Sequence, residues 1–134
     1  MTRHYHAGTL GTDLITAMMA SAHRNAQRIA LVASGEQFTY GALMDRARRI
    51  GHTIHAAREA RHTQTGPLGA VMGSRTPASF VGVLGTILSG AAYVPLNPAF
   101  PVKRTEQMLR AAGVESLVVE EHDLGGLSEM LNAF

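Results

Sequence analysis

Glycines and histidines are the residues whose types and spacing most resemble a phosphate or metal site. Gly82, Gly85 and Gly90 form one glycine series, and His52 and His55 lie three positions apart. A glycine loop that holds a phosphate lies between a strand and a helix and turns its backbone N–H groups toward the ligand. These glycines instead lie within and just after an apolar stretch with a helical pattern. We interpret them as residues that allow close helix packing and end the helix.

The histidines are weak candidates for metal ligands. His52 and His55 can share one face of a predicted helix, but no carboxylate or third histidine stands at a matching spacing. His4 and His6 fall near the start of the chain, in a stretch that we expect to be a flexible lead-in. We therefore predict no metal ligands among them.

A second glycine series and two serines are better explained by turns and caps. Gly66, Gly69 and Gly73 surround a predicted strand, but they do not open a helix with the spacing of a phosphate loop. Ser74 and Ser89 have no neighbouring base and no nucleophile-elbow pattern, so we interpret them as turn and cap residues.

Two tyrosines and one acidic group complete the candidates for chemistry. Tyr40 and Tyr93 are predicted to be core aromatics whose hydroxyls find backbone partners. Glu120, Glu121 and Asp123 could together attract a cation, but a solvated strand end explains them better. We predict no catalytic, cofactor-binding or metal-binding residue in this chain.

Composition restricts the class of protein. The 134 residues are 46% hydrophobic and 16% charged, they contain no cysteine, and the formal net charge is +2. The absence of cysteine excludes disulfides, thiolate metal sites and a cysteine nucleophile. Arg46, Arg48 and Arg49 fit a solvated helix face better than a nucleic-acid surface. The apolar window 80–94 is too short to cross a membrane, so we expect a cytoplasmic protein with no membrane or nucleic-acid partner.

Caps and apolar spacing predict the helices. Thr76 is a candidate N-cap followed by Pro77 at the first helical position, and Gly90 and Gly113 are candidate stops. The predicted helices cover residues 12–22, 39–60, 77–89 and 101–112, with a short final helix within 124–134. Three of these helices have an apolar face that is expected to point inward. On 12–22 it contains Leu14, Ile15, Met18, Met19 and Ala22, and on 39–60 it contains Leu43, Ala47, Ile50, Ile54 and Ala57. On 101–112 it contains Val102, Thr105, Leu109 and Ala112.

Strands are predicted between these helices. Residues 29–33 and a stretch resuming at Phe38 are expected to form a hairpin around a turn at 34–37. Further strands are expected at 68–72, 91–94 and 116–120, and 91–94 reads as too apolar to face water. Because strands and helices alternate along the chain, the sequence predicts an α/β fold with a mostly parallel sheet and helices on its faces.

Two motifs carry a resemblance to a known family. Residues 38–43, Phe-Thr-Tyr-Gly-Ala-Leu, resemble the first core motif of adenylate-forming enzymes. Residues 84–98 are similar to the second core motif: Gly90 to Leu96 and Pro98 match directly, while Ser89 replaces alanine and Asn97 replaces aspartate. The resemblance extends over roughly residues 14–120 and is greatest to the amino-acid adenylation domains of nonribosomal peptide synthesis.

The resemblance implies a reaction and a place in the enzyme. Such enzymes join a carboxylate to the α-phosphate of ATP with Mg²⁺, and then pass the acyl group to the thiol of a carrier protein. Residues 12–134 would be part of the first subdomain of the enzyme's N-terminal region, preceded by the lead-in 1–11. Its role would be to support a nucleotide site in a secondary-metabolite enzyme.

The family's chemical residues are missing from this sequence. Its Thr/Ser/Gly-rich phosphate loop has no counterpart here, and the only lysine, Lys103, lies in the helix after the second motif. We therefore expect no adenylation and no tight ATP binding by this chain alone. Three alternatives stay open: an N-terminal fragment, a protein that completes an enzyme with a partner chain, and a remnant that kept the packing and lost the activity. The apolar helix expected at 77–89 favours a partner or self-association through exposed apolar surface. A noncatalytic interaction module in natural-product biosynthesis is the rival function.

Overall fold

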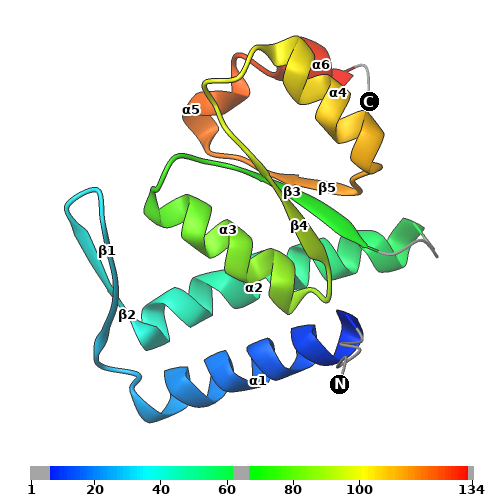
Figure 1. Ribbon diagram of the computed structural model, residues 1–134. Helices are drawn as coiled ribbons and strands as arrows, with labels where there is room; N and C mark the ends of the chain where they lie inside the picture. The colour runs from blue at the N-terminus through cyan, green and yellow to red at the C-terminus, as the bar shows by residue number, and fades with distance from the viewer. Residues whose placement is uncertain (1–6, 62–66, 133–134) are drawn as a thin grey trace, which may run out of the picture.

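A small parallel sheet organises the fold. The computed structural model describes residues 7–61 and 67–132, with side chains described from residue 14 onward. Strand β3 (Leu68–Met72) lies between β4 (Ala92–Leu96) and β5 (Ser116–Val118), and both neighbours run parallel to it. Gly69 is in register with Tyr93 on one side and Ser116 on the other. The predicted α/β class and parallel sheet are confirmed (Figure 1).

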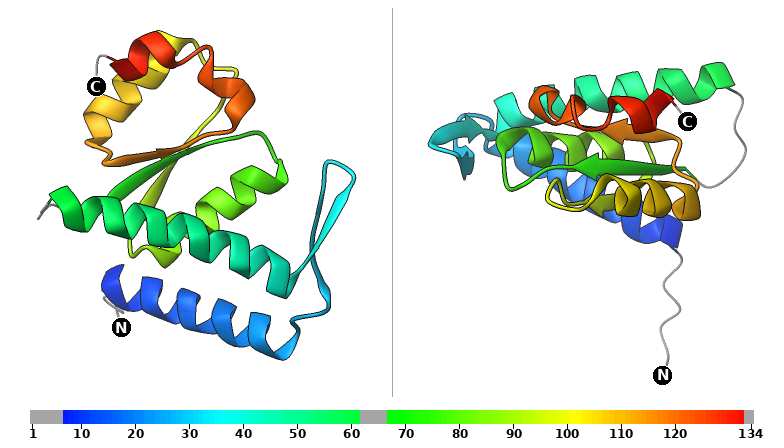
Figure 2. Two further views of the ribbon diagram at one scale, coloured as in Figure 1. Left: turned by 180° about the vertical axis from the view of Figure 1, so that it is seen from behind. Right: turned by 90° about the horizontal axis from the view of Figure 1, so that it is seen from above.

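Helices cover both faces of this sheet. On one face lies α3 (Pro77–Leu88), with α2 (Tyr40–Arg61) packed against it. The other face carries α4 (Val102–Ala112) and the short helices α5 (Glu121–Leu124) and α6 (Ser128–Asn132), as Figure 2 shows. The core on that second face contains Ala70, Met72, Leu96, Leu109, Leu127 and Met130. Burial of this apolar set holds α4 and α6 on the sheet.

A separate hairpin precedes the sheet, as the sequence predicts. Strands β1 (Ile29–Ala33) and β2 (Glu36–Thr39) pair antiparallel. Ser34 and Gly35 both have positive φ, 52° and 76°, which is the backbone twist that a two-residue hairpin turn requires. At the end of β2, the Thr39 hydroxyl accepts the Ala42 N–H at 3.2 Å and caps α2.

The caps expected for α3 and α4 are also confirmed. Thr76 is the N-cap of α3, and its side chain accepts the Ser79 N–H at 3.2 Å. Pro77 opens the helix, where its missing N–H is not needed. Gly90 follows α3 with φ 82°, and Gly113 ends α4 in the left-handed conformation with φ 62°.

The expectation that residues 91–94 form a fully buried strand is wrong. Strand β4 is the edge of the described sheet, and Tyr93, expected in the core, is 42% exposed. The Ala92 N–H donates to the Pro67 carbonyl and the Leu96 carbonyl accepts the Gly73 N–H, and these two partners flank β3. Alternation therefore turns the backbone of Tyr93 and Pro95 toward the open edge. Pro95 has no N–H to offer there, and proline in a sheet is typical of such an edge.

Helix boundaries and faces differ in detail from the expectation. The first helix, α1 (Ala7–Arg24), begins before the expected start at residue 12, so part of the expected lead-in 1–11 is helical. Residues 1–6 lie outside the described part. Four residues expected to face inward are exposed: Leu14, Met19, Ala57 and Val102.

The buried stripe of α2 explains part of this difference. The stripe runs through Met44, Ala47, Gly51 and Ile54, because the helix turns its small residues toward α3. Ala57 lies beyond the end of that stripe and is exposed.

In the part of the chain that the structure describes, no helix is long and apolar enough to cross a bilayer.

Candidate functional site

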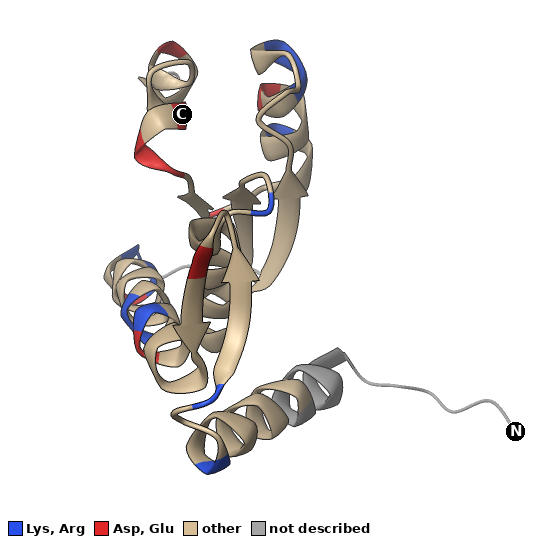
Figure 3. Cartoon of the chain, turned by 90° about the vertical axis from the view of Figure 1, so that its left-hand side faces the viewer, with Lys and Arg blue, Asp and Glu red and all other residues tan. Residues whose placement is uncertain are grey.

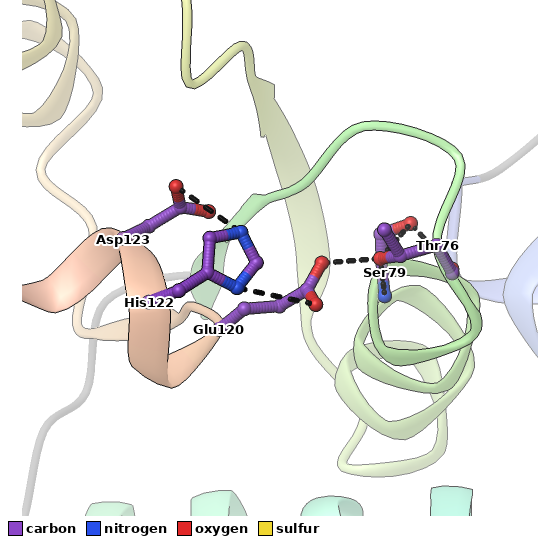
Figure 4. Close-up of polar contacts among 5 residues, drawn as sticks. All are labelled: Thr76, Ser79, Glu120, His122 and Asp123. Carbon is purple, nitrogen blue, oxygen red and sulfur yellow. Dashed lines mark hydrogen bonds and ion pairs between the residues drawn. The ribbon is translucent and has the colours of Figure 1, made fainter. Parts of the chain in front are cut away.

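The carboxyl ends of β3 and β5 form the best-defined candidate site. After β3 the chain passes to α3 on one face, and after β5 it passes to α5 on the other. In open α/β sheets, the carboxyl ends of adjacent parallel strands that exit to opposite faces are the usual ligand position. The polar side chains here are Thr76, Ser79, Glu120, His122 and Asp123 (Figure 4).

Thr76 joins the two exits. Its hydroxyl donates a hydrogen bond to Glu120 Oε1 and accepts the Ser79 N–H, so one side chain caps α3 and connects it to the end of β5. The Ser79 hydroxyl donates to the Thr76 carbonyl at 2.8 Å. The Glu120 side chain is only 18% exposed. A carboxylate at this position also interacts favourably with the positive end of the α3 dipole.

A histidine lies between two carboxylates at the same edge. His122 Nδ1 is 3.9 Å from Glu120 Oε2, and His122 Nε2 is 3.5 Å from Asp123 Oδ1. The His122 side chain is 66% exposed, so it lies at the surface. The other oxygen of Asp123, Oδ2, is buried and has no hydrogen-bond partner.

This arrangement does not fit the phosphates of ATP. A phosphate at a helix N-terminus needs free backbone N–H groups and no competing anion. Pro77 has no N–H, the Ser79 N–H is already bonded to Thr76, and the Glu120 carboxylate lies at the same helix end. We therefore derive no step of nucleotide chemistry from these residues. Among the described residues, no group of three or more His, Asp or Glu side chains is placed to hold a metal ion.

Gly69, Gly82 and Gly85 are packing positions. A Cβ added at Gly82 would lie 2.9 Å from Val118 Cγ1, and one added at Gly85 would lie 2.6 Å from Ile50 Cβ. The turn interpretation is wrong for Gly69, which lies within β3, where an added Cβ would lie 2.7 Å from Thr86 Cγ2. The packing interpretation is confirmed for Gly82 and Gly85, while Gly66 lies outside the described residues.

The other candidates are not brought together. His52 and His55 are exposed on α2, and His4 and His6 lie outside the described residues. Ser74 is exposed in the turn before α3.

Ser89 and Tyr40 have structural positions of different kinds. Ser89 is the C-cap of α3, and its hydroxyl donates to the Thr86 carbonyl at 2.7 Å. Tyr40 is half-buried at the start of α2.

Arg46, Arg48 and Arg49 are exposed along α2, where Figure 3 shows basic residues on the outer side of the helix. Arg48 lies 3.6 Å from Asp45, and the Arg46 guanidinium lies 4.6 Å from the centre of the Phe38 ring. An aromatic residue of the preceding strand, β2, therefore lies under one arginine of this basic face.

Sequence reasoning missed the contacts between distant segments. Thr76 and Glu120 are 44 positions apart, and only the expectation that parallel strands end at one edge could have brought them together. Arg58 Nε lies 3.3 Å from Glu115 Oε2, and Arg58 also donates to the Ser89 carbonyl at 3.4 Å. Nothing in the local pattern of α2 indicates either contact.

Comparison with known proteins gives a consistent picture. The family model described as "AMP-binding enzyme" matches residues 18–133. Tyrocidine synthase 3 of Brevibacillus parabrevis is 34% identical over 103 residues, which cover 75% of this chain and 2% of that protein. N-(5-amino-5-carboxypentanoyl)-L-cysteinyl-D-valine synthase of Streptomyces clavuligerus is 30% identical over 114 residues, which cover 85% of this chain and 14% of that protein. The chain thus spans a small part of these relatives.

Solved structures agree in fold. The nonribosomal peptide synthetase FmoA3, in a form bound to α-methyl-L-serine-AMP, superposes with a TM-score of 0.69 at 32% identity. That match covers 78% of this chain and 11% of FmoA3. IdnL7 superposes with a TM-score of 0.74 at 24% identity, over 90% of this chain and 23% of IdnL7, a likeness of fold.

Proposed function

The chain belongs to the family of AMP-binding enzymes, and from this we propose that it forms the supporting sheet of an enzyme that activates an amino acid or another carboxylic acid as its adenylate. The observation that carries the proposal is the match to the family over residues 18–133. These residues include the sheet β4-β3-β5 and the helices on both of its faces. The similarity to peptide synthetases favours amino acids among the possible acids.

The complete reaction would have two halves. A carboxylate oxygen attacks the α-phosphate of ATP, and pyrophosphate leaves with the electrons of the broken P–O bond. A carrier-protein thiol then attacks the acyl carbon, and AMP leaves. Both halves depend on groups that neutralise phosphate charge and position the reactants. ATP and Mg²⁺ belong to this proposal for the whole enzyme, and a carrier protein would be its partner.

This chain would contribute architecture to that enzyme. The first turn of α3, at the end of the central strand, is closed by the Thr76 cap and the Glu120 carboxylate. The Glu120 carboxylate at this helix end repels a phosphate. Its hydrogen bond with Thr76 holds α3 in a fixed position relative to the sheet. We accordingly propose that the chain alone neither binds ATP tightly nor forms an adenylate.

Exposed apolar side chains support the rival function of an interaction module. Val32 is 64% exposed on the hairpin, Phe80 is 43% exposed on α3, and Tyr93 is 42% exposed on β4. Such side chains favour association with further polypeptide or with a second copy. Light scattering on the purified chain separates the cases, since self-association gives a mass above that of the 14.3 kDa monomer.

Isothermal titration with ATP and Mg²⁺ tests the proposed inertness. The scaffold role predicts no saturable heat at micromolar nucleotide. As a control, an intact adenylation domain titrated under the same conditions should show binding. A micromolar isotherm for this chain would mean that the carboxyl edge does hold phosphates, and the scaffold role would be wrong.

A further inference from the structure

The outer edge of β5 is open in the described part of the sheet. The strand order β4-β3-β5 leaves β4 and β5 each paired on one side only. The Glu115 N–H donates to the Leu68 carbonyl, so alternation turns the backbone groups of Ser116 and Val118 away from β3. Glu120, two residues past the strand, still has extended backbone angles. The edge therefore presents N–H and C=O groups with which a further strand can pair.

The two edges of the sheet differ in what they offer to such a strand. The outward backbone positions of β4 are Tyr93 and Pro95, and a proline has no N–H to donate. The outward positions of β5, Ser116 and Val118, both keep their N–H groups. A proline is one of the features that protect a sheet edge from pairing, and β5 has none. Addition of a strand is therefore favoured at β5 over β4.

A groove of about 500 Å³ lies beside the carboxyl end of β5, between α2 and α3. Ile50 of α2, Val81 of α3 and Val118 of β5 contribute to its apolar lining. The Val118 side chain lies on the α3 face of the sheet, because a Cβ added at Gly82 of α3 would lie 2.9 Å from Val118 Cγ1. A strand added to β5 turns every second side chain toward this face, and therefore toward the groove.

The α2 wall of the groove is basic. Arg46 and Arg49 both line it, and neither forms an ion pair with a carboxylate of the described residues. Two carboxylates, Glu36 and Glu120, also line the groove. Glu120 already accepts a hydrogen bond from the Thr76 hydroxyl. The two arginines therefore provide positive charge for an acidic side chain that enters from outside.

From the open edge, the apolar lining and the two arginines together, we propose that β5 binds an extended peptide segment of a partner protein as a fourth strand. The backbone of the segment pairs with Ser116 and Val118. Its inward side chains are apolar, except for one acidic residue that faces Arg46 and Arg49. In this mode of recognition, main-chain hydrogen bonds supply affinity and the alternate side chains supply specificity. The inference goes beyond the proposed scaffold role, and it requires no nucleotide.

Two acetylated hexapeptide amides serve as matched probes. One has the sequence Val-Thr-Glu-Thr-Val-Thr, and the other has glutamine in place of glutamate. In both, the valines and the central residue share one face, so the comparison isolates the acidic charge. With the chain labelled with nitrogen-15 for NMR, the amides of Ser116 and Val118 report on the β5 edge. The amide of Tyr93, at the β4 edge, is the internal reference.

The expected result is a saturable shift of the Ser116 and Val118 signals with the glutamate peptide, while the Tyr93 signal stays in place. The glutamine peptide should bind about threefold more weakly, since exposed ion pairs are modest in strength. Arg49→Gln should reduce this difference between the peptides. Arg48→Gln, which changes an exposed arginine paired with Asp45 on the same helix, should leave the difference unchanged.

Hydrogen exchange separates strand pairing from contact through side chains alone. With the glutamate peptide at about twenty times its dissociation constant, exchange of the Ser116 and Val118 amides should slow about tenfold or more, because both N–H groups become hydrogen-bonded. Exchange of the Tyr93 amide should keep its rate. Binding through side chains alone would shift the signals without protecting these amides.

Three results would overturn the proposal: no saturable shift at Ser116 and Val118, equal affinity for the two peptides, or unprotected amides in the bound state. A dimer in light scattering that binds neither peptide would assign the edge to a second copy, which also contradicts it. If Arg49→Gln does not fold, the two peptides and the exchange rates on the unmodified chain still decide. Because ATP takes no part, the outcome is separate from that of the nucleotide titration.

Discussion

The Thr76 hydroxyl, after β3, donates to the Glu120 carboxylate, after β5. The same Thr76 oxygen accepts the Ser79 N–H, so the contact caps α3 and joins its first turn to the segment that follows β5. Two strands whose connections leave in different directions are thus held together at their carboxyl ends. This contact makes the edge a structural junction in the described chain.

Replacing Thr76 with valine should destabilise the protein. Valine keeps the β-branched shape but removes both the cap acceptor and the donor to Glu120. Loss of an N-cap costs about 1–2 kcal/mol of unfolding free energy, and the unpaired Glu120 oxygen adds to this. Urea denaturation measures the change. Ser74→Ala, in the exposed turn before the cap, is the matched control and should stay within about 0.5 kcal/mol. Equal stability of the two variants would show that the junction contributes nothing.

Adding one methyl group at Gly85 should disrupt the α2–α3 contact. The new Cβ would lie 2.6 Å from Ile50 Cβ and 2.9 Å from the Ala47 carbonyl oxygen. Overpacking of this kind costs about 1–3 kcal/mol, which outweighs the gain of about 1 kcal/mol in helix propensity when the clash is with backbone. Thermal unfolding should show a lower Tm for Gly85→Ala. Gly125→Ala has open space around the new methyl group and should leave the Tm nearly unchanged. A raised Tm for Gly85→Ala would contradict the close packing.

Arg58 should matter more than the other arginines of α2. Its contacts with Glu115 Oε2 and the Ser89 carbonyl tie the end of α2 to β5 and to the C-cap of α3. The paired side chains are only 21% and 10% exposed, so removing the arginine takes one cation away from a mostly buried carboxylate. We expect Arg58→Ala to cost about 1–2 kcal/mol in urea denaturation. Arg48→Ala breaks an exposed pair, with side chains 54% and 69% exposed, and should cost less than about 0.5 kcal/mol. The reverse order of these two costs would refute the assignment.

Local signals predict the elements of this fold well. Helices begin after Thr39 and Thr76, whose hydroxyls cap them, as the side chains indicate. Helices end near Gly90 and Gly113, as the conformational preference of glycine indicates. Pro77 also marks a helix start, because its lost N–H is harmless at a first helical position. These features depend on residues a few positions apart, and such spacing is visible in a sequence.

Burial is harder to predict, because it depends on what lies beside an element. The apolar strand 91–94 reads as fully buried, yet β4 is an edge strand with Tyr93 exposed. The assignment to the adenylate-forming family rests on the motif and the family match. It does not depend on the expected burial of residues 91–94. Pro95 was the available signal, since a proline in a strand indicates an edge.

The candidate site was the least predictable part. Glu120 was expected at a solvated strand end, and its side chain is instead mostly buried against Thr76. The partner lies in a different element, and only the three-dimensional order of the strands brings the two together.

The central claim, that these residues are the supporting sheet of an acid-activating enzyme, is tested most directly by a graft. Residues 18–133 would replace the matching segment of the FmoA3 adenylation domain, which is 32% identical to this chain. Amino-acid-dependent exchange of pyrophosphate into ATP would be measured, with a second graft carrying Gly85→Ala as the control for correct packing. The scaffold role predicts exchange by the first graft and reduced exchange by the second. A folded, soluble graft with no exchange would contradict the account.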